Sequence, residues 1–172
     1  MNAFVRILLV GYDPQWPQLY EREARRIRAA LGARALQIEH AGSTSVPGLA
    51  AQPVIDIILS VPDSADEDAY RPALEAAGYV FAFREIDWYQ HRLFHGPDTN
   101  LNLHVFSSGC LETDRMLRFR DWLRSHPGDR ELYQRTKLAL AEREWPSVQD
   151  YADAKTKVVE EIIARYSSSW GK

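Results

Sequence analysis

A loop of small hydroxyl residues precedes an apolar run that carries a single acid. The loop GSTS occupies positions 42–45, and the run VIDIILSV contains Asp56. An ionised carboxylate with apolar neighbours needs a partner such as a metal ion, a lysine or several N–H donors. A glycine lets the backbone approach a ligand closely, and hydroxyl groups add polar contacts. The pattern predicts a phosphate-binding cradle beside a metal-binding carboxylate, with a tight turn and a structurally paired acid as the alternative. The candidate phosphate-binding residues in and beside the loop are His40, Gly42, Ser43, Thr44 and Ser45.

A second polar pattern lies in the segment LNLHVF, where leucine and valine alternate with Asn102 and His104. Alternation gives a strand one apolar and one partly polar face. If this strand lies beside the run of Asp56, His104 is close to that carboxylate. Asp56 and His104 would then bind a divalent ion, with Mg²⁺ expected, or act as the catalytic pair with His104 as proton carrier. The alternative is a hydrogen-bonded structural histidine. His91 and His95, four apart on a predicted strand, do not indicate zinc.

The last third of the chain repeats a tyrosine–lysine spacing. Tyr133 precedes Lys137 by four positions, and Tyr151 precedes Lys155 in the same way. Residues four apart share a helix face, so each lysine is in line with core-type residues and either reaches outward to water or meets an anion. Four cations are expected to face one cleft that suits a nucleotide or another phosphorylated small molecule: Arg120, Arg124, Lys137 and Lys155. Exposed cations paired with nearby acids are the alternative.

Composition narrows the class of protein. The 172 residues have a formal net charge of −3, which favours neither specific nucleic-acid binding nor an anionic membrane. Cys110 is the single cysteine, so no intramolecular disulfide can form, and a reducing cytoplasm is the expected location. No segment has the length of a membrane span, and the start lacks a recognisable leader. We expect one domain over residues 1–172, with a sheet part in about 1–110 and a helical part in about 111–168.

Turn signals and hydrophobic periodicity predict the order of elements. Strands are expected at 5–10, 35–40, 54–61, 79–84, 88–95 and 101–106. Helices are expected at 14–31, 62–77, 112–125, 129–144 and 148–166, followed by a frayed tail at 167–172. Strands mixed with helices and followed by a helical block predict an α+β or mixed α/β domain with a C-terminal helical lid.

Several ordered segments resemble the GrpB family, over nearly all of the chain. They are YDPQWPQLYERE, EHAGSTSVPGLAAQPVIDI, NLHVF, FRDWLRSHP and the two Y-x-x-x-K spacings. The resemblance implies a nucleotidyltransferase-like mixed β-sheet flanked by helices, with a glycine-serine loop that holds phosphates and strand acids that bind magnesium. The chain departs from that pattern at Ile58, where a second acid is expected, and at Gln52, where family members carry lysine. A related domain fused to dephospho-coenzyme A kinase in some bacteria points to nucleotide or coenzyme biology.

Three functional hypotheses follow. The first is a nucleotidyl or phosphoryl transferase acting on a small phosphorylated substrate, with an incomplete set of acids. The second is a non-catalytic module that binds a nucleotide or supports a partner enzyme. The third is a pocket for a carboxylated metabolite, because the same cations suit carboxylates. The numerous Trp and Tyr residues are compatible with a homodimer surface and equally with a core.

Overall fold

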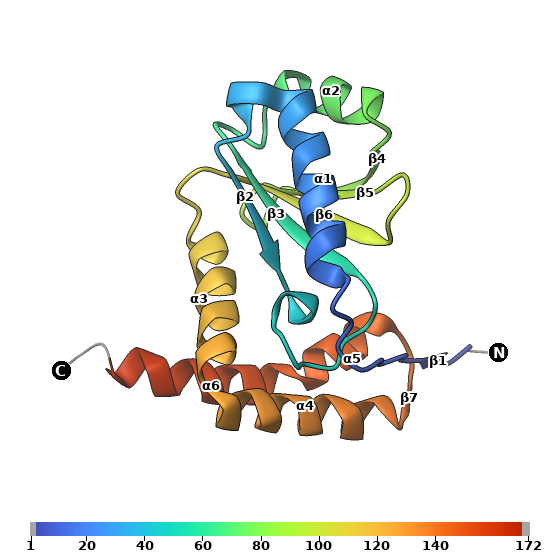
Figure 1. Cartoon of the computed structure of the whole chain (residues 1–172), viewed down its shortest axis with the longest axis vertical. Coiled ribbons are helices and arrows are strands. Elements are labelled where there is room, and N and C mark those ends of the chain that lie inside the picture. Colours follow the sequence, from blue (N-terminus) through green and yellow to red (C-terminus); the bar gives the residue numbers. More distant parts are fainter. Residues whose placement is uncertain (1–2, 170–172) are drawn as a thin grey trace.

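The computed structural model describes residues 3–169 as a twisted sheet with helices on both faces and across one end (Figure 1). The strands are β1 (Val5–Arg6), β2 (Gln37–Ala41), β3 (Ile55–Val61), β4 (Val80–Glu85), β5 (His91–His95), β6 (Leu101–Ser107) and β7 (Glu144–Trp145). The α-helices are α1 (Trp16–Leu31), α2 (Arg71–Ala76), α3 (Leu111–Ser125), α4 (Pro127–Ala141), α5 (Val148–Ala154) and α6 (Thr156–Ser169). Short 3-10 turns occur at Gly32–Arg34, Ser43–Ser45 and Glu67–Ala69.

The main sheet has the strand order β2-β3-β6-β5-β4. β3 and β6 run parallel, and the other neighbouring pairs are antiparallel. The register places Asp56 of β3 between Ala41 of β2 and Asn102 of β6. The strands of Asp56 and His104 are therefore neighbours, which is the condition under which the sequence places His104 close to Asp56. The fold class, a mixed sheet flanked by helices with a C-terminal helical segment, is confirmed.

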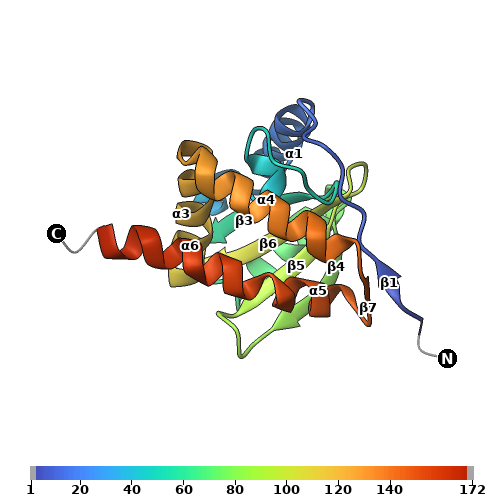
Figure 2. The same cartoon turned by 90° about the horizontal axis from the view of Figure 1, so that it is seen from below.

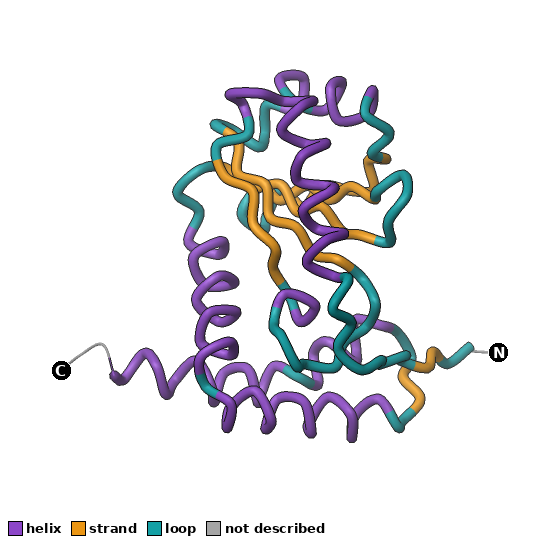
Figure 3. The backbone as a smooth tube through the Cα atoms, viewed as in Figure 1, coloured by secondary structure: helices purple, strands orange, loops and turns teal. Residues whose placement is uncertain are grey.

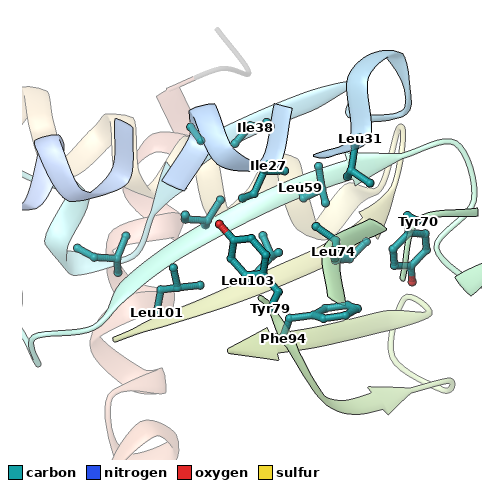
Figure 4. Close-up of a cluster of buried hydrophobic side chains, with 14 of the residues drawn as sticks. Ile27, Leu31, Ile38, Leu59, Tyr70, Leu74, Tyr79, Phe94, Leu101 and Leu103 are labelled. Carbon is teal, nitrogen blue, oxygen red and sulfur yellow. The ribbon is translucent and has the colours of Figure 1, made fainter. Parts of the chain in front are cut away.

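The two faces of β3 pack against different parts of the protein because side chains alternate across a strand. Ile55, Ile57 and Leu59 point toward α1 and α2, where they join Ile27 and Leu74 in the largest buried cluster (Figure 4). Ile58 points the other way and packs with Ala41, Phe106 and apolar residues of α3. Asp56 has the same parity as Ile58, so its carboxylate lies on the α3 side, at the start of the strand.

The C-terminal helices close one end of the sheet. α4 and α6 run side by side below the strands in Figure 1, and they lie in front of the strands when the molecule is seen from that end (Figure 2). Leu123 of α3, Tyr133 of α4 and Ile162 of α6 form a second buried cluster with Val46 and Leu49. The loop after β2 contributes Val46 and Leu49, so this cluster attaches the hydroxyl-rich loop to the helices.

Two early elements differ from the sequence prediction. The strand expected at 5–10 is reduced to β1, which pairs with β7 outside the main sheet, and a single bridge from Val10 to Ala51. The helix expected at 62–77 contains only a 3-10 turn and α2 (Figure 3). Asp63 accepts a hydrogen bond from the Ala65 amide and Ser64 bonds to Ser107, so these polar contacts hold the segment in a turn.

Two later elements also differ. The strand expected from residue 88 begins at His91, because Trp88–Gln90 form a turn with positive φ at Tyr89 and Gln90. The helix expected at 148–166 is divided into α5 and α6 at Lys155, whose amide bonds to Ala152 with 3-10 spacing. α6 then continues to Ser169, within the segment expected to fray, while 170–172 lie outside the described residues. Within residues 3–169, no helix is long and apolar enough to cross a membrane.

Candidate functional site

A pocket of about 370 Å³ lies where the first residues of β3 and β6 meet α3, α4 and α5. Its floor includes the 3-10 turn Ser43–Ser45, and apolar side chains of α3, Phe119 among them, form one wall. A pocket of this size holds a small ligand. The polar residues that line it are Gly42, Ser43, Thr44, Gln52, Asp56, Asn102, Arg120, Tyr133, Lys137, Tyr151 and Lys155.

Gly42 is required because the backbone passes directly over the carboxylate of Asp56. Gly42 has φ +70°, a conformation that residues with a side chain rarely adopt. A Cβ atom at this position would also collide with Asp56 Oδ2. The glycine of the loop thus allows a close approach to Asp56 as well as a turn. The hydroxyl of Ser45 donates to the Gly42 carbonyl and fixes the turn from within.

Asp56 is paired through a chain of hydrogen bonds that runs from the pocket to the surface. Its Oδ1 lies 3.0 Å from Nε2 of His104, and Nδ1 of His104 lies 3.0 Å from Nε2 of His91. Nδ1 of His91 lies 2.9 Å from Oε1 of the half-exposed Glu85. With both carboxylates ionised, all three bonds form together only when the two rings carry three N–H protons between them. Burial and the neighbouring His104 lower the pKa of His91 to about 4. The acid in the apolar strand therefore has a hydrogen-bond partner in His104, which is itself held in place by His91.

Lys137 reaches into the pocket from α4 and is held at its tip. Its Nζ donates to Ser43 Oγ at 2.9 Å and to the Ala50 carbonyl oxygen at 2.7 Å. Only 2% of the residue is exposed. Burial, with a smaller contribution from Lys155, lowers the pKa of Lys137 from 10.5 to about 7. A buried amine beside a second cation holds its proton weakly, and an anion between the two would strengthen that hold.

Lys155 and Tyr151 offer polar groups that form no hydrogen bonds with other side chains or backbone groups of residues 3–169. Lys155 lies at the break between α5 and α6, with Nζ 4.7 Å from the centre of the Tyr151 ring. Burial lowers the pKa of Lys155, and the charge of Asp56 opposes this change. The Tyr151 hydroxyl is buried and has no hydrogen-bond partner among residues 3–169. Buried polar groups are rarely left unpaired, so these two side chains point to a ligand in the pocket.

The arginines and His40 do not join the lysines as the sequence predicted. Arg120 lines the pocket, but its guanidinium bonds to Glu39, Asp121 and the His40 carbonyl. Arg124 donates to the Ser45 carbonyl oxygen. Arg124, His40 and Ser45 line a separate hollow on the other side of the turn. The expected cluster of four cations around one cleft is thus wrong; Lys137 and Lys155 are the pair that meets across the pocket with no acid attached.

His40 has a structural environment. Its ring stacks on Tyr20, and its Nε2 lies 2.9 Å from the hydroxyl of Thr44, which lines the pocket. Burial, followed by the charge of Arg124, lowers the pKa of His40 to about 4. His40 is therefore neutral near pH 7 and orients Thr44 rather than adding positive charge.

The family model for "GrpB protein" matches residues 6–165 of the chain. The chain belongs to the GrpB family. A UPF0157 protein of Halalkalibacterium halodurans is 60% identical over 163 residues, which cover 95% of this chain and 84% of that protein. The crystal structure of GrpB from Enterococcus faecalis superposes with a TM-score of 0.77 at 29% identity, covering 92% of this chain and 99% of that one. A dephospho-CoA kinase of Mycolicibacterium paratuberculosis is 31% identical over 175 residues, which cover 87% of this chain and 43% of the kinase.

The donor set of this GrpB protein does not fit a resident magnesium ion. Both ring nitrogens of His104 are engaged in hydrogen bonds, one of them to Asp56. Ile58 removes the second carboxylate from the strand, and Mg²⁺ prefers several oxygen ligands. Among the residues that the structure describes, no three His, Cys, Asp or Glu side chains form a metal-binding group. These residues alone do not make a magnesium site, and magnesium dependence stays a prediction.

Sequence reasoning missed several residues of the GrpB pocket. Asn102 lies beside Asp56 in the register and lines the pocket, and the alternation of its strand could have indicated it. Tyr151 was a member of a helical stripe, but nothing in the sequence showed that its hydroxyl is unpaired. His91 joins the site only through His104, a contact that depends on the pairing of β5 with β6. Gln52 lines the pocket at the position where the family resemblance implied a lysine.

Proposed function

We propose that this GrpB protein binds a small phosphorylated molecule, such as a nucleotide or a coenzyme precursor, in the pocket between the sheet and the C-terminal helices. The observation that carries the proposal is that Lys155, Lys137 and Tyr151, whose buried hydroxyl has no hydrogen-bond partner among residues 3–169, all line one cavity. Neither lysine forms an ion pair with an acid in the described part of the chain. A phosphate would supply acceptors for both ammonium groups and for the tyrosine.

The opposite wall of the pocket favours a ligand that also carries hydroxyl or amide groups. Asp56 has one oxygen bonded to His104, and Asn102 beside it both donates and accepts hydrogen bonds. A ribose or a similar polyol would match these groups while its phosphate meets the lysines. The dephospho-CoA kinase relatives make coenzyme A precursors a reasonable part of the ligand screen. Transfer of a nucleotidyl or phosphoryl group, as the family resemblance implies, is a further step of the same proposal.

Two alternatives remain in the same pocket. A non-catalytic module would bind the phosphorylated ligand without changing it. A carboxylated metabolite would use the same lysines. A phosphate has more acceptor oxygens than a carboxylate, and the volume of about 370 Å³ and the additional hydroxyl of Tyr151 favour a ligand with more acceptors. We further propose a cytoplasmic location, which the single Cys110 supports. A homodimer is best tested by light scattering.

Calorimetry and thermal shift would test the proposal. Nucleotides, dephospho-coenzyme A and dicarboxylates are titrated with and without Mg²⁺ into the wild type, Lys155→Met and Lys157→Met. Lys157 is exposed, two positions after Lys155, and makes a matched control. Loss of a charged hydrogen bond costs about 2 kcal/mol, so Lys155→Met should weaken phosphate binding by roughly 30-fold while the control does not change it. Binding of dicarboxylates alone would favour the third hypothesis, and equal binding by both variants would contradict the site.

A further inference from the structure

Beyond its part in the proposed phosphate site, Lys137 forms a hydrogen-bonded pair with Ser43. Lys137 Nζ lies 2.9 Å from Ser43 Oγ, although the two residues are 94 positions apart in the chain. The Ala50 carbonyl oxygen, 2.7 Å from the same nitrogen, fixes the direction of the lysine. Burial raises the pKa of Tyr133, and its interaction with Ser43 opposes that rise. The serine is half-buried and lines the pocket, so a ligand can reach it.

The arrangement has the parts of an activated nucleophile. A serine hydroxyl is a weak nucleophile unless a base lies within about 2.6–3.2 Å and is itself oriented by a third group. Lys137 meets the first requirement and the Ala50 carbonyl meets the second. Lys155 gives the contrast, because its ammonium has no hydrogen-bond acceptor among the described residues and is placed to meet an anion directly. The two lysines of the pocket therefore have different surroundings and different roles.

We infer that Ser43 is a nucleophile and Lys137 its general base, and that the pair takes a phosphoryl or nucleotidyl group from a phosphate anhydride such as a nucleoside triphosphate. The inference rests on the proposed function for its substrate class. Neutral Lys137 accepts the Ser43 proton while Oγ bonds to phosphorus, and the bond from phosphorus to the bridging oxygen breaks. The leaving group departs beside Lys155 and Tyr151, as a nucleoside diphosphate anion in phosphoryl transfer or as pyrophosphate in nucleotidyl transfer. Water then attacks the phosphorus of the seryl ester and releases one proton to solvent, and Ser43 Oγ recovers its proton from Lys137.

The protonation of Lys137 agrees with this role. Burial and Lys155 lower its pKa to about 7, so near neutral pH a large share of the protein carries the free amine that a base needs. The ionisable groups around it are Lys155 after α5, Tyr133 on the same helix, and Asp56, Tyr151 and Arg120, which also line the pocket. Removing the positive charge of Lys155 should raise the pKa of Lys137 and move any pH profile that depends on it.

A neutral alkyl fluorophosphonate tests the pair without relying on anion binding. The probe phosphonylates activated serines with loss of fluoride, and mass spectrometry identifies the modified residue. We expect one label on Ser43, with a rate that rises with pH around the lysine pKa of about 7. Lys137→Met and Lys137→Arg should each slow labelling by at least about 100-fold, the loss typical for a general base. The arginine variant retains the charge, which guards against a simple folding defect.

Two further variants separate a base from a structural lysine. Lys155→Met should shift the pH profile of labelling to higher pH, whereas Lys157→Met should leave rate and profile unchanged. Calorimetric titration with AMP and inorganic phosphate tests the proposed function in parallel. The inference is overturned, and the proposed function left intact, if AMP binds but Ser43 is not labelled, or if the labelling rate is the same in the Lys137 variants as in the wild type. A Lys137-dependent label without binding of either phosphate supports the pair and contradicts the proposed substrate class.

Discussion

Replacing Lys137 with methionine should stabilise the folded protein near pH 7. Methionine has a similar length, and its apolar side chain packs well in a buried site. The fall in pKa of Lys137 from 10.5 to about 7 means that burying the charged amine lowers the free energy of unfolding at pH 7 by on the order of 4 kcal/mol. The hydrogen bonds to Ser43 and the Ala50 carbonyl return about 1 kcal/mol each, and the variant loses them. We therefore expect Lys137→Met to raise the free energy of unfolding by roughly 1–3 kcal/mol at pH 7.

The sign of the pH dependence follows from the direction of the pKa change. Between the folded pKa of about 7 and the unfolded value of 10.5, the unfolded chain binds the extra proton. The stability of the wild type therefore rises with pH across this window, by about 1.4 kcal/mol per pH unit at its steepest. Below about pH 7 both states are protonated and the penalty is constant. The advantage of Lys137→Met should shrink and then reverse as the pH approaches 10.5.

Urea unfolding followed by tryptophan fluorescence at several pH values measures both effects. Lys157→Met is the control, because substitution of an exposed helical residue changes the free energy of unfolding by no more than about 0.5 kcal/mol. The quantity to compare is the difference in unfolding free energy between each variant and the wild type. A difference for Lys137→Met that is the same at pH 7 and pH 9 would refute the reasoning. So would a loss of several kcal/mol at pH 7, which would show that the lysine is a net stabilising contact.

Three other substitutions test separate contacts. Gly42→Ala should lower the free energy of unfolding by roughly 2–4 kcal/mol, because the new Cβ collides with Asp56 and the backbone at position 42 is strained for alanine. The control in the same urea assay is Gly128→Ala, where the new Cβ contacts nothing within 4 Å. His104→Ala should cost roughly 1–3 kcal/mol by leaving Asp56 without its hydrogen-bond partner, and a loss below about 0.5 kcal/mol would contradict the hydrogen-bonded chain. Tyr151→Phe should leave the stability of the ligand-free protein unchanged or raise it by about 1 kcal/mol, because the lost hydroxyl is unpaired. Calorimetry should show weaker phosphate binding by the same variant. A stability loss above about 1 kcal/mol would mean that the hydroxyl already has a partner.

Periodicity in the sequence was enough to place the central residues of the site. Alternation in β3 put Asp56 opposite the main core, and alternation in β6 brought His104 to it. The four-residue spacing from Tyr133 to Lys137 put that lysine on the inner face of α4. These predictions depend on one element each, or on one pair of neighbouring strands, so local pattern decides them.

The failures concern contacts between elements that are distant in the chain. Arg120 lies on the predicted helix, but Glu39 of β2 pairs with it, and no local pattern identifies that partner. Arg124 follows it by one helical turn and bonds to a carbonyl on the far side of the loop. The break before α6 falls at Lys155, which lines the pocket, and the sequence has no proline or glycine there. Charge neutralisation and helix interruption are thus set by tertiary packing.

Lys137 and Ser43 lie far apart in the chain, so the order of translation determines when both halves of this hydrogen-bonded pair are present. Every strand of the main sheet has been translated before α4 emerges, so the hydroxyl-rich turn is exposed on a nascent chain that has no base beside it. Lys137 and the helices that complete the cavity come last in the chain. A chain that stalls before α4 therefore lacks the base that Ser43 needs, and we expect it to be inert.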